Sequence, residues 1–299
     1  PVTFTGNVTF VDGGAIDKSL ILTGDAALGA VTRTLTVATG TTVAGKVVDF
    51  QGIISSTGAF GITKAGTGTL TLSGANTYTG NTFVNNGTLI LNGSVQSPSS
   101  LVNFAATLMG TGTAFRDVRN AGIFAPGASG HGTFRIRGNY LQTGAGTMVI
   151  EIAGAGSGQH DRVEVGGAAT LDGTLRLVRV GGARLKVGDK VTFLTATGGV
   201  TGQFATVDNE LAATDSLFRT EVVYEANAVS VEATQGSFLQ FAQEQRLTPN
   251  QRTVGAMLDK VAASPRQKKL IAFLNGETLA QLPADFDRIA PDEIQALYT

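Results

Sequence analysis

A five-residue phrase, Gly-Thr-apolar-x-apolar, recurs along this 299-residue chain. Its alternating apolar residues are typical of a short strand with one buried face. The first two copies begin at Gly68 and Gly87, a spacing close to the length of one solenoid coil. One such strand cannot bury its face alone, so we expect stacked coils. The copies are Gly68–Leu72, Gly87–Leu91, Gly132–Ile136, Gly146–Ile150 and Gly173–Leu177, with a weaker one at Gly112-Thr113.

The composition favours an ordered β protein. Glycine is abundant (40 residues) while proline is scarce (7), which indicates glycine in turns rather than collagen. The net charge of −1 indicates no attraction to nucleic acid or to an anionic membrane. The absence of cysteine excludes disulfides and thiolate chemistry, and no apolar run reaches the roughly 20 residues of a membrane helix. Because the chain begins at Pro1 without a signal peptide, we expect a processed product or a fragment.

Three regions are expected along the chain. Copies of the phrase follow one another at similar intervals as far as Gly132, after which the interval first shortens, to Gly146, and then lengthens, to Gly173. We interpret this change as the end of a regular stack, residues 1–145, and the start of an irregular β cap with longer strands, residues 146–234. Residues 235–299 have helical spacing. Helix starts are expected at Thr248-Pro249 and Ser264-Pro265, a stop at Asn275-Gly276, and short helices after Pro283 and Pro291.

The segment ITKAGTGTLTLSGANTYTGNTFVNNGTLILN, residues 62–92, resembles the passenger-associated transport repeat of bacterial autotransporters. Later stretches of the chain, including its helical tail, also resemble parts of that family. The resembling positions in the repeat are Lys64, Gly66, Gly68, Thr69, Leu70, Leu72, Gly74, Asn76, Thr77, Tyr78, Gly80, Thr82, Val84, Gly87, Thr88 and Leu89.

The resemblance implies a mainly β fold, a right-handed parallel β-helix exported through the outer membrane of a Gram-negative-type bacterium. It also implies an autochaperone-like role for residues 146–234. Residues 235–299 would then be a small helical segment before the chain's own translocating β-barrel, a partner that is absent from this sequence. The family resemblance implies no enzymatic activity by itself.

We interpret the repeat residues as structural. Leu70 and Leu72 should point inward with Leu89 and Leu91 stacked on them one coil later, each buried leucine contributing roughly 1.5–3 kcal/mol. Glycine permits the tight corner before each strand, and asparagine amides such as that of Asn76 can satisfy turn backbone. The structural set comprises Gly66, Gly68, Thr69, Leu70, Leu72, Gly74, Asn76, Tyr78, Gly80, Gly87, Thr88, Leu89 and Leu91.

Few residues are candidates for catalysis or ligand binding. Ser129 lies near His131, but the surrounding sequence is a glycine-rich turn and lacks the Gly-x-Ser-x-Gly pattern. His160-Asp161 follows one imperfect, unrepeated copy of a calcium-binding β-roll pattern, and we interpret it as a loop in which Asp161 caps the next strand.

The tail carries acidic and basic clusters that are typical of helices. Asp285 and Asp287 are expected near a helix start and Asp292-Glu293 in a first turn, where negative charge complements the helix dipole. Arg266, Lys268 and Lys269 are interpreted as a solvated helix face. We expect no catalytic, cofactor-binding or metal-binding residues.

The sequence favours a structural and export module that acts as stalk and folding scaffold of a surface-displayed or secreted protein. One alternative is a self-assembling fibre or adhesin subunit, formed by end-to-end stacking at the first strands, residues 2–11. A second alternative is a surface hydrolase, in which Ser129 and His131 would be the first residues to mutate.

Overall fold

The computed structural model describes residues 2–10, 19–38, 47–96, 101–103, 106–128, 130–181, 185–211 and 217–289. Two compact units divide the chain. The first comprises residues 1–184, 191–209 and 222–230, and the second comprises residues 185–190, 210–221 and 231–299. The division passes through three strands, so each unit is described by itself.

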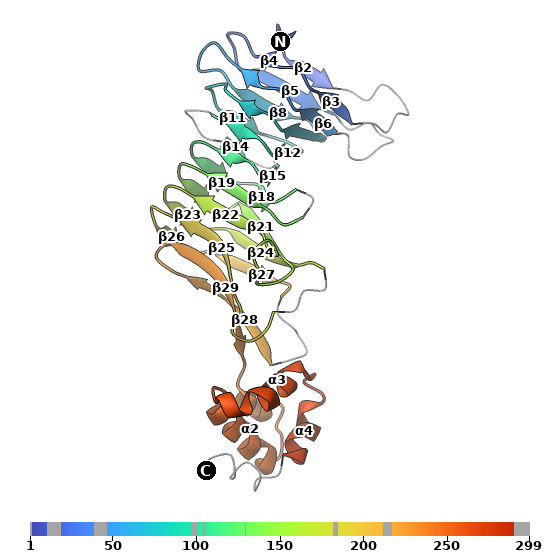
Figure 1. Ribbon diagram of the computed structural model, residues 1–299, viewed down its shortest axis with the longest axis vertical. Helices are drawn as coiled ribbons and strands as arrows, with labels where there is room; N and C mark the ends of the chain where they lie inside the picture. The colour runs from blue at the N-terminus through green and yellow to red at the C-terminus, as the bar shows by residue number, and fades with distance from the viewer. Residues whose placement is uncertain are drawn as a thin grey trace. The chain divides into compact units, whose positions relative to one another are not determined.

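The first unit winds through three strands per coil, and corresponding strands of successive coils pair in parallel (Figure 1). The first face contains β2 (Val8–Phe10), β5 (Arg33–Val37), β8 (Ile62–Ala65), β11 (Thr82–Val84), β14 (Leu101–Asn103), β17 (Val118–Asn120), β20 (Tyr140–Gln142), β23 (Ala169–Leu171) and β26 (Val200–Gly202). The second face contains β3 (Leu20–Leu22), β6 (Val47–Phe50), β9 (Thr69–Leu72), β12 (Thr88–Leu91), β15 (Thr107–Gly110), β18 (Ile123–Pro126), β21 (Thr147–Ile152), β24 (Thr174–Arg179) and β27 (Thr206–Asn209).

The third face consists of two sheets. One contains β1 (Val2–Thr3), β4 (Ala26–Ala27) and β7 (Ile54–Ser55). The other contains β10 (Ala75–Asn76), β13 (Ser94–Val95), β16 (Thr113–Ala114), β19 (Thr133–Ile136), β22 (Arg162–Val165), β25 (Lys190–Ala196), β29 (Ala228–Gln235) and β28 (Phe218–Tyr224). This mainly β, parallel stack confirms the predicted β-helix.

Apolar side chains of the second face stack in register and form the core. Because side chains alternate along a strand, every second residue points inward. One column of directly paired residues, all fully buried, passes from coil to coil: Val48, Leu70, Leu89, Leu108, Phe124, Met148 and Leu175. Each coil therefore buries its apolar face on its neighbours, as a repeat protein requires.

The copies of the Gly-Thr phrase lie on two faces. Thr133 belongs to β19 on the third face, whereas Thr69, Thr88, Thr147 and Thr174 begin strands of the second face. The short interval between Gly132 and Gly146 therefore marks no end of the stack, and our interpretation of it is wrong. Pairing on the second face continues in parallel as far as β27.

The coils lengthen along the second face. In the repeat region Thr88 pairs with Thr69 and then with Thr107, so two successive coils have the same length. Further along, Thr174 pairs with Thr147 and then with Thr206, and each of these coils contains more residues than the last. The extra residues enter the connections, because the strand pairing itself is unbroken. A boundary at residue 145 therefore stays a prediction.

The third face ends in antiparallel strands. Glu225 donates its backbone N–H to the carbonyl of Ala228 at 2.8 Å, and Gly236 donates to Leu217 at 2.7 Å, so β28 and β29 form a hairpin. The bond from Ala196 N to the carbonyl of Asn227, 2.8 Å, makes β29 antiparallel to β25 as well. The last strand of this sheet, β28, is therefore part of an antiparallel hairpin, so the sheet does not end in a parallel strand of the stack.

The helices of the second unit are α1 (Phe238–Glu244), α2 (Pro249–Val261), the 3₁₀ helix η1 (Pro265–Gln267), α3 (Lys268–Gly276) and α4 (Leu282–Arg288). The expected starts at Thr248 and Ser264 and the stop at Gly276 are confirmed, and Thr248 forms a capping box with Gln251. Their core contains Phe238, Phe241, Val254, Leu258, Leu274 and Phe286. The helix expected after Pro291 lies outside the described residues.

Asp259 of α2 fixes the start of α1. Its carboxylate accepts hydrogen bonds from the hydroxyl of Ser237 (2.6 Å) and from the backbone N–H groups of Phe238 (2.8 Å) and Leu239 (3.1 Å). The first N–H groups of a helix have no partner inside the helix, so an acidic side chain from a neighbour can satisfy them.

Candidate functional site

Lys64 lies inside the stack. Its side chain is fully buried, since β8 alternates and Lys64 shares the inward face with Ile62. The Lys64 ammonium donates to the carbonyls of Ala65 (2.9 Å), Gly66 (2.7 Å) and Asn86 (2.9 Å). These carbonyls belong to corners of two successive coils, so one side chain joins both. Burial lowers the pKa of Lys64 from 10.5 to about 8.

The corner beside Lys64 requires glycine. Gly66 and Gly87 have φ of +74° and +68°, which disfavours other residues. A Cβ on Gly87 would lie 2.5 Å from the carbonyl oxygens of both Gly66 and Gly68. At this corner the backbones of two successive coils are in contact with no side chain between them. The Lys64 ammonium binds carbonyls of both coils here.

Asn76 joins the two sheets of the third face. Its fully buried side chain accepts a hydrogen bond from Ile54 N at 3.0 Å and donates to the carbonyls of Gly74 and Ser94, each at 3.0 Å. The Asn76 side-chain oxygen thus accepts the hydrogen bond from Ile54 N of β7 that a backbone carbonyl would accept in a continuous sheet.

Tyr78 and Thr82 form a second polar contact inside the repeat. The Tyr78 hydroxyl lies 2.6 Å from Thr82 Oγ1, and the ring is fully buried. Burial raises the pKa of Tyr78 above its ordinary value.

A neutral polar cluster occupies the interior between β17 and β20. Asn120 Nδ2 donates to Gln142 Oε1 at 3.0 Å and to the carbonyl of Thr147 at 3.3 Å. The Tyr140 hydroxyl donates to the same Gln142 oxygen, and Gln142 Nε2 donates to the carbonyl of Thr174 at 3.1 Å. Burial raises the pKa of Tyr140, so the cluster stays neutral at physiological pH.

A hollow of about 320 Å³ lies at the edge of the second face of the first unit. Its walls include apolar side chains such as those of Met109 and Val180, together with three ionisable residues, His131, Glu151 and Asp161. The structure therefore brings together His131 and Asp161, which the sequence places in separate loops.

Asp161 holds the wall of this hollow. Its carboxylate, 1% exposed, accepts hydrogen bonds from Gly132 N and Glu151 N, both at 2.9 Å. Burial raises the pKa of Asp161 from 3.8 to about 7, although the two backbone donors oppose this shift. A side chain at Gly127 would meet Asp161 Oδ1 at 2.9 Å, so the Gly127 turn closes directly over the carboxyl group.

Residues 62–91 match the family described as Passenger-associated-transport-repeat. The match spans the coil corners held by Lys64, the amide bridge of Asn76 and the Tyr78–Thr82 contact. It contains all thirteen residues that we interpret as structural.

Three curated proteins are similar to part of the chain. Two are named extracellular serine protease, from Serratia marcescens, and are 37% and 35% identical over 154 residues, which is 48% of this chain and 14% of each protein. The third is the adhesin BmaC autotransporter of Brucella suis biovar 1 (strain 1330), 36% identical over 144 residues, 46% of this chain and 4% of that protein. The resemblance to autotransporter passengers is therefore confirmed, as is the extracellular or cell-surface setting that it implies.

Within the repeat, the two Gly-Thr strands pair residue by residue. Leu89 lies opposite Leu70 and Leu91 opposite Leu72, and all four side chains are fully buried. Gly68 and Gly80 are buried at coil corners, and Asn86 accepts a hydrogen bond from Gly87 N at 2.7 Å.

Sequence reasoning missed the polar interior. Asn120 and Gln142 were not singled out, and the burial of Lys64 was not expected. A signal was nevertheless present, because Lys64, Asn120 and Gln142 each stand two residues after an inward-facing residue of the same short strand.

His160, the chain neighbour of Asp161, is not among the residues that line the hollow. His160 is 8% exposed and its Nδ1 lies 3.3 Å from the carbonyl of Gly154, and burial lowers its pKa. Ser129 lies outside the described residues. No group of three histidine, aspartate or glutamate side chains within the described ranges is arranged to hold a metal ion.

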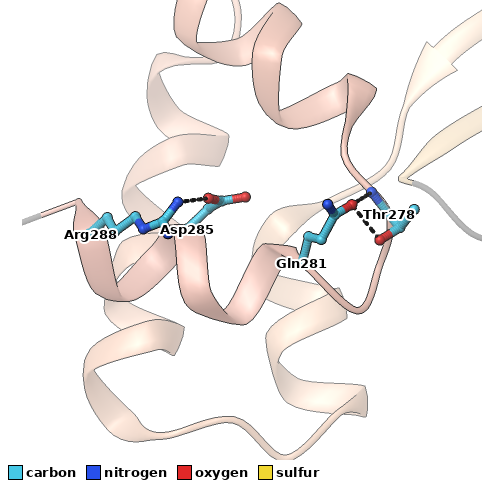
Figure 2. A network of polar contacts seen from close by, with 4 residues as sticks. All are labelled: Thr278, Gln281, Asp285 and Arg288. Atoms are coloured by element: carbon cyan, nitrogen blue, oxygen red, sulfur yellow. Dashed lines mark hydrogen bonds and ion pairs between the residues drawn. The ribbon is translucent and has the colours of Figure 1, made fainter.

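In the tail, Asp285 and Arg288 form a contact within α4 (Figure 2). Asp285 lies in the first turn as expected, whereas Asp287 lies in the last turn, which corrects that expectation. Figure 2 also shows Gln281, whose Oε1 accepts hydrogen bonds from the backbone and hydroxyl of Thr278. Asp292 and Glu293 lie outside the described residues.

The basic residues Arg266, Lys268 and Lys269 are exposed at the start of α3. Across the part of the chain that the structure describes, none of the helices is both long and apolar enough to cross a membrane.

Proposed function

We propose that this chain is a structural and export module of an autotransporter passenger, acting as stalk and folding scaffold. The unbroken column of paired, buried residues from Val48 to Leu175 carries this proposal. Such a column lets each coil template the next, because every added coil buries its inner side chains on a finished one.

The three-part organisation extends the proposal. Residues 1–145 form the stalk, residues 146–234 an autochaperone-like end, and residues 235–299 a helical segment before the chain's own β-barrel. The long strands β21 and β24, which pair over six residues, and the antiparallel hairpin β28–β29 support early folding of the later coils.

Paired substitutions in the full-length precursor test this role. Ile150 is buried and its neighbour Val149 faces outward on β21, while Leu89 and Ile90 form the same kind of pair on β12. We expect Ile150→Asp to abolish surface display of an N-terminal epitope, and Leu89→Asp to reduce it less. The controls Val149→Asp and Ile90→Asp should display normally. Normal display of Ile150→Asp, or of a precursor lacking residues 146–234, would refute the scaffold role.

We further propose that the chain has no enzymatic activity of its own, although two relatives are named serine proteases. These relatives are far longer than the matched region, so their activity can reside elsewhere in them. Protease and esterase assays on the purified chain should be negative, and activity lost in His131→Ala would favour the hydrolase alternative.

A fibre or adhesin subunit is the second candidate. The strands β1, β2 and β3 end their sheets, and Val2 and Ile21 are 64% and 54% exposed. Unpaired strand edges of this kind favour end-to-end stacking with another copy. Sedimentation velocity at increasing concentration should show oligomers that Ile21→Lys prevents, and a monomer at all concentrations would refute this candidate.

A further inference from the structure

Three asparagines of the chain are followed directly by glycine: Asn86, Asn92 and Asn275. The side-chain amide of such an asparagine can react with the backbone nitrogen of the next residue, because glycine has no Cβ to hinder the approach. Neither a stalk nor a scaffold requires this chemistry. Asn275 lies near the end of α3, where its amide donates to Gln235 Oε1 at 3.2 Å, while the other two lie at exposed corners of the repeat.

The Asn86 side chain lies against the nitrogen of its own peptide bond. Gly87 N donates to Asn86 Oδ1 at 2.7 Å, and the amide carbon is one C=O bond, about 1.2 Å, from that oxygen. Among the described residues, Gly87 N has no other hydrogen-bond partner. The side chain is exposed, so water reaches the site. The fold therefore holds a nitrogen and an amide carbon close together, which favours an intramolecular reaction between them.

Lys64 contacts the same peptide bond from inside the stack. Its ammonium donates to the carbonyl oxygen of Asn86 at 2.9 Å. Gly87 N can attack only after it has lost its proton, and the negative charge is then shared between this nitrogen and the carbonyl oxygen of the same peptide bond. A preorganised cationic donor at that oxygen stabilises the deprotonated peptide, as the donors of an oxyanion hole stabilise an anion.

Asn92 is a matched contrast within the same repeat, since it is exposed like Asn86. Gly93 N, however, donates to the carbonyl of Leu72 in the preceding coil at 2.9 Å. Asn92 Oδ1 accepts from Thr111 N in the following coil at 3.4 Å. The nitrogen and the amide of this dipeptide are therefore held by neighbouring coils rather than against each other.

We propose that the folded chain modifies itself at Asn86, by a deamidation that Lys64 promotes. Gly87 N loses its proton to solvent and forms a bond to the Asn86 amide carbon. The bond between that carbon and the side-chain nitrogen breaks, and the nitrogen takes a proton from water and leaves as ammonia. Water then opens the cyclic imide to aspartate or isoaspartate. A carboxylate replaces the amide, and no oxidant or reductant is needed.

Peptide mapping by mass spectrometry measures the rates while the purified chain is incubated in heavy-oxygen water at neutral pH. One tryptic peptide, residues 65–116, contains both Asn86 and Asn92, and fragment ions separate them. The heavy oxygen marks only modification that occurs during the incubation. We expect Asn86 to react about tenfold faster than Asn92, because the backbone hydrogen bond of Gly93 N must first open. In urea the two should react at similar rates.

Lys64→Met should slow the reaction of Asn86 about tenfold or more, because the donor to the peptide oxygen is lost. Thr63→Ala is the matched control, since Thr63 faces outward on β8, and it should leave the rate unchanged. The rate at Asn92 reports whether each variant is folded, because an unfolded variant reacts there as fast as the chain in urea. If Lys64→Met unfolds, the comparison of the unsubstituted chain with and without urea still decides the proposal.

Equal rates at Asn86 and Asn92 in the folded chain, or a difference that persists in urea, would overturn the proposal. An unchanged Asn86 rate in a folded Lys64→Met variant would overturn it as well. The scaffold role is measured by surface display and does not depend on any of these results.

Discussion

Two regions of the stack bury polar side chains in the same inward column of the first face, but they do so differently. Backbone pairing runs from Lys64 through Val84 and Asn103 to Asn120 and Gln142. Lys64 brings a charge to its position, whereas Asn120 and Gln142 form a neutral pair. In both regions the side chains end on backbone carbonyls at the corner that leads to the second face.

The comparison of Lys64 with the Asn120–Gln142 pair shows what the polar side chains of this column have in common. The polar groups differ in charge and length, but each donates to a backbone carbonyl at or beside the corner that leads to the second face. Each such bond ties the inward side chain of one face to the backbone of the next, so the polar interior holds the corners together. The charged version carries an additional desolvation cost, which gives it a pH dependence that the neutral version lacks.

The largest expected effect is that of Lys64→Ala. The substitution removes the donor shared by the carbonyls of Ala65, Gly66 and Asn86 and opens a cavity, which together should cost about 3 kcal/mol or more. Urea unfolding followed by circular dichroism measures it. Thr63→Ala, which changes the outward neighbour on β8, should cost less than about 1 kcal/mol. Equal costs at the two positions would show that the Lys64 contacts contribute nothing.

Gln142→Leu should have a smaller effect, about 2 kcal/mol. It keeps the volume but removes the acceptor of the Tyr140 hydroxyl and the donor to Thr174, while Asn120 retains its bond to the carbonyl of Thr147. Leu141→Gln on the outward side of β20 is the control and should be nearly neutral, because Leu141 is 39% exposed. A loss as large as that of Lys64→Ala would contradict the distinction between the two clusters.

Local structure could be predicted well from the sequence. The copies of the Gly-Thr phrase at Gly146–Ile150 and Gly173–Leu177 lead into the strands β21 and β24, because both segments alternate between inward and outward residues. The helix start at Thr248 was also predicted, since its capping box depends on neighbours in the sequence alone.

Two features could not be predicted because they depend on which strands stack. The copies of the Gly-Thr phrase at residues 112 and 132 belong to the third face, and only the three-dimensional winding separates them from the copies on the second face. The hollow likewise brings together His131 and Asp161 from separate loops, and spacing along the chain contains no sign of that contact.

Asp161 extends the comparison to a buried acid. Its pKa is raised to about 7 in the folded chain, so the folded state binds the proton more tightly than the unfolded state. The free energy of unfolding should therefore fall as pH rises from about 4 to 7. Asp161→Asn should remove this pH dependence of the free energy of unfolding. The variant also loses one of the two hydrogen bonds from Gly132 N and Glu151 N, because an asparagine side chain has one acceptor oxygen. Thermal unfolding of both proteins over this range measures the difference, and parallel curves would contradict the raised pKa.

Lys64 should give a dependence of opposite sign at higher pH. Burial lowers its folded pKa to about 8 while the unfolded value stays near 10.5, so the unfolded state holds the proton more tightly in this interval. Stability should rise from pH 8 to 10.5, and the rise should be absent in Lys64→Met. The comparison uses the difference between the two proteins, because the tyrosines contribute equally to both. A rise of equal size in Lys64→Met would assign it to another group.

The smallest effect is expected for the outward counterpart of these contacts. Arg135 and Glu164 lie directly opposite each other on β19 and β22, and their side chains approach to 3.0 Å while 46% and 38% exposed. Water screens such a pair, so a double-mutant cycle with Arg135→Ala and Glu164→Ala should give a coupling of about 0.5 kcal/mol that decreases with salt. The inward contact of Lys64 should keep its effect at high salt, because solvent ions cannot reach it. A salt-independent coupling at Arg135–Glu164 would mean that exposure does not distinguish the two kinds of polar contact in this stack.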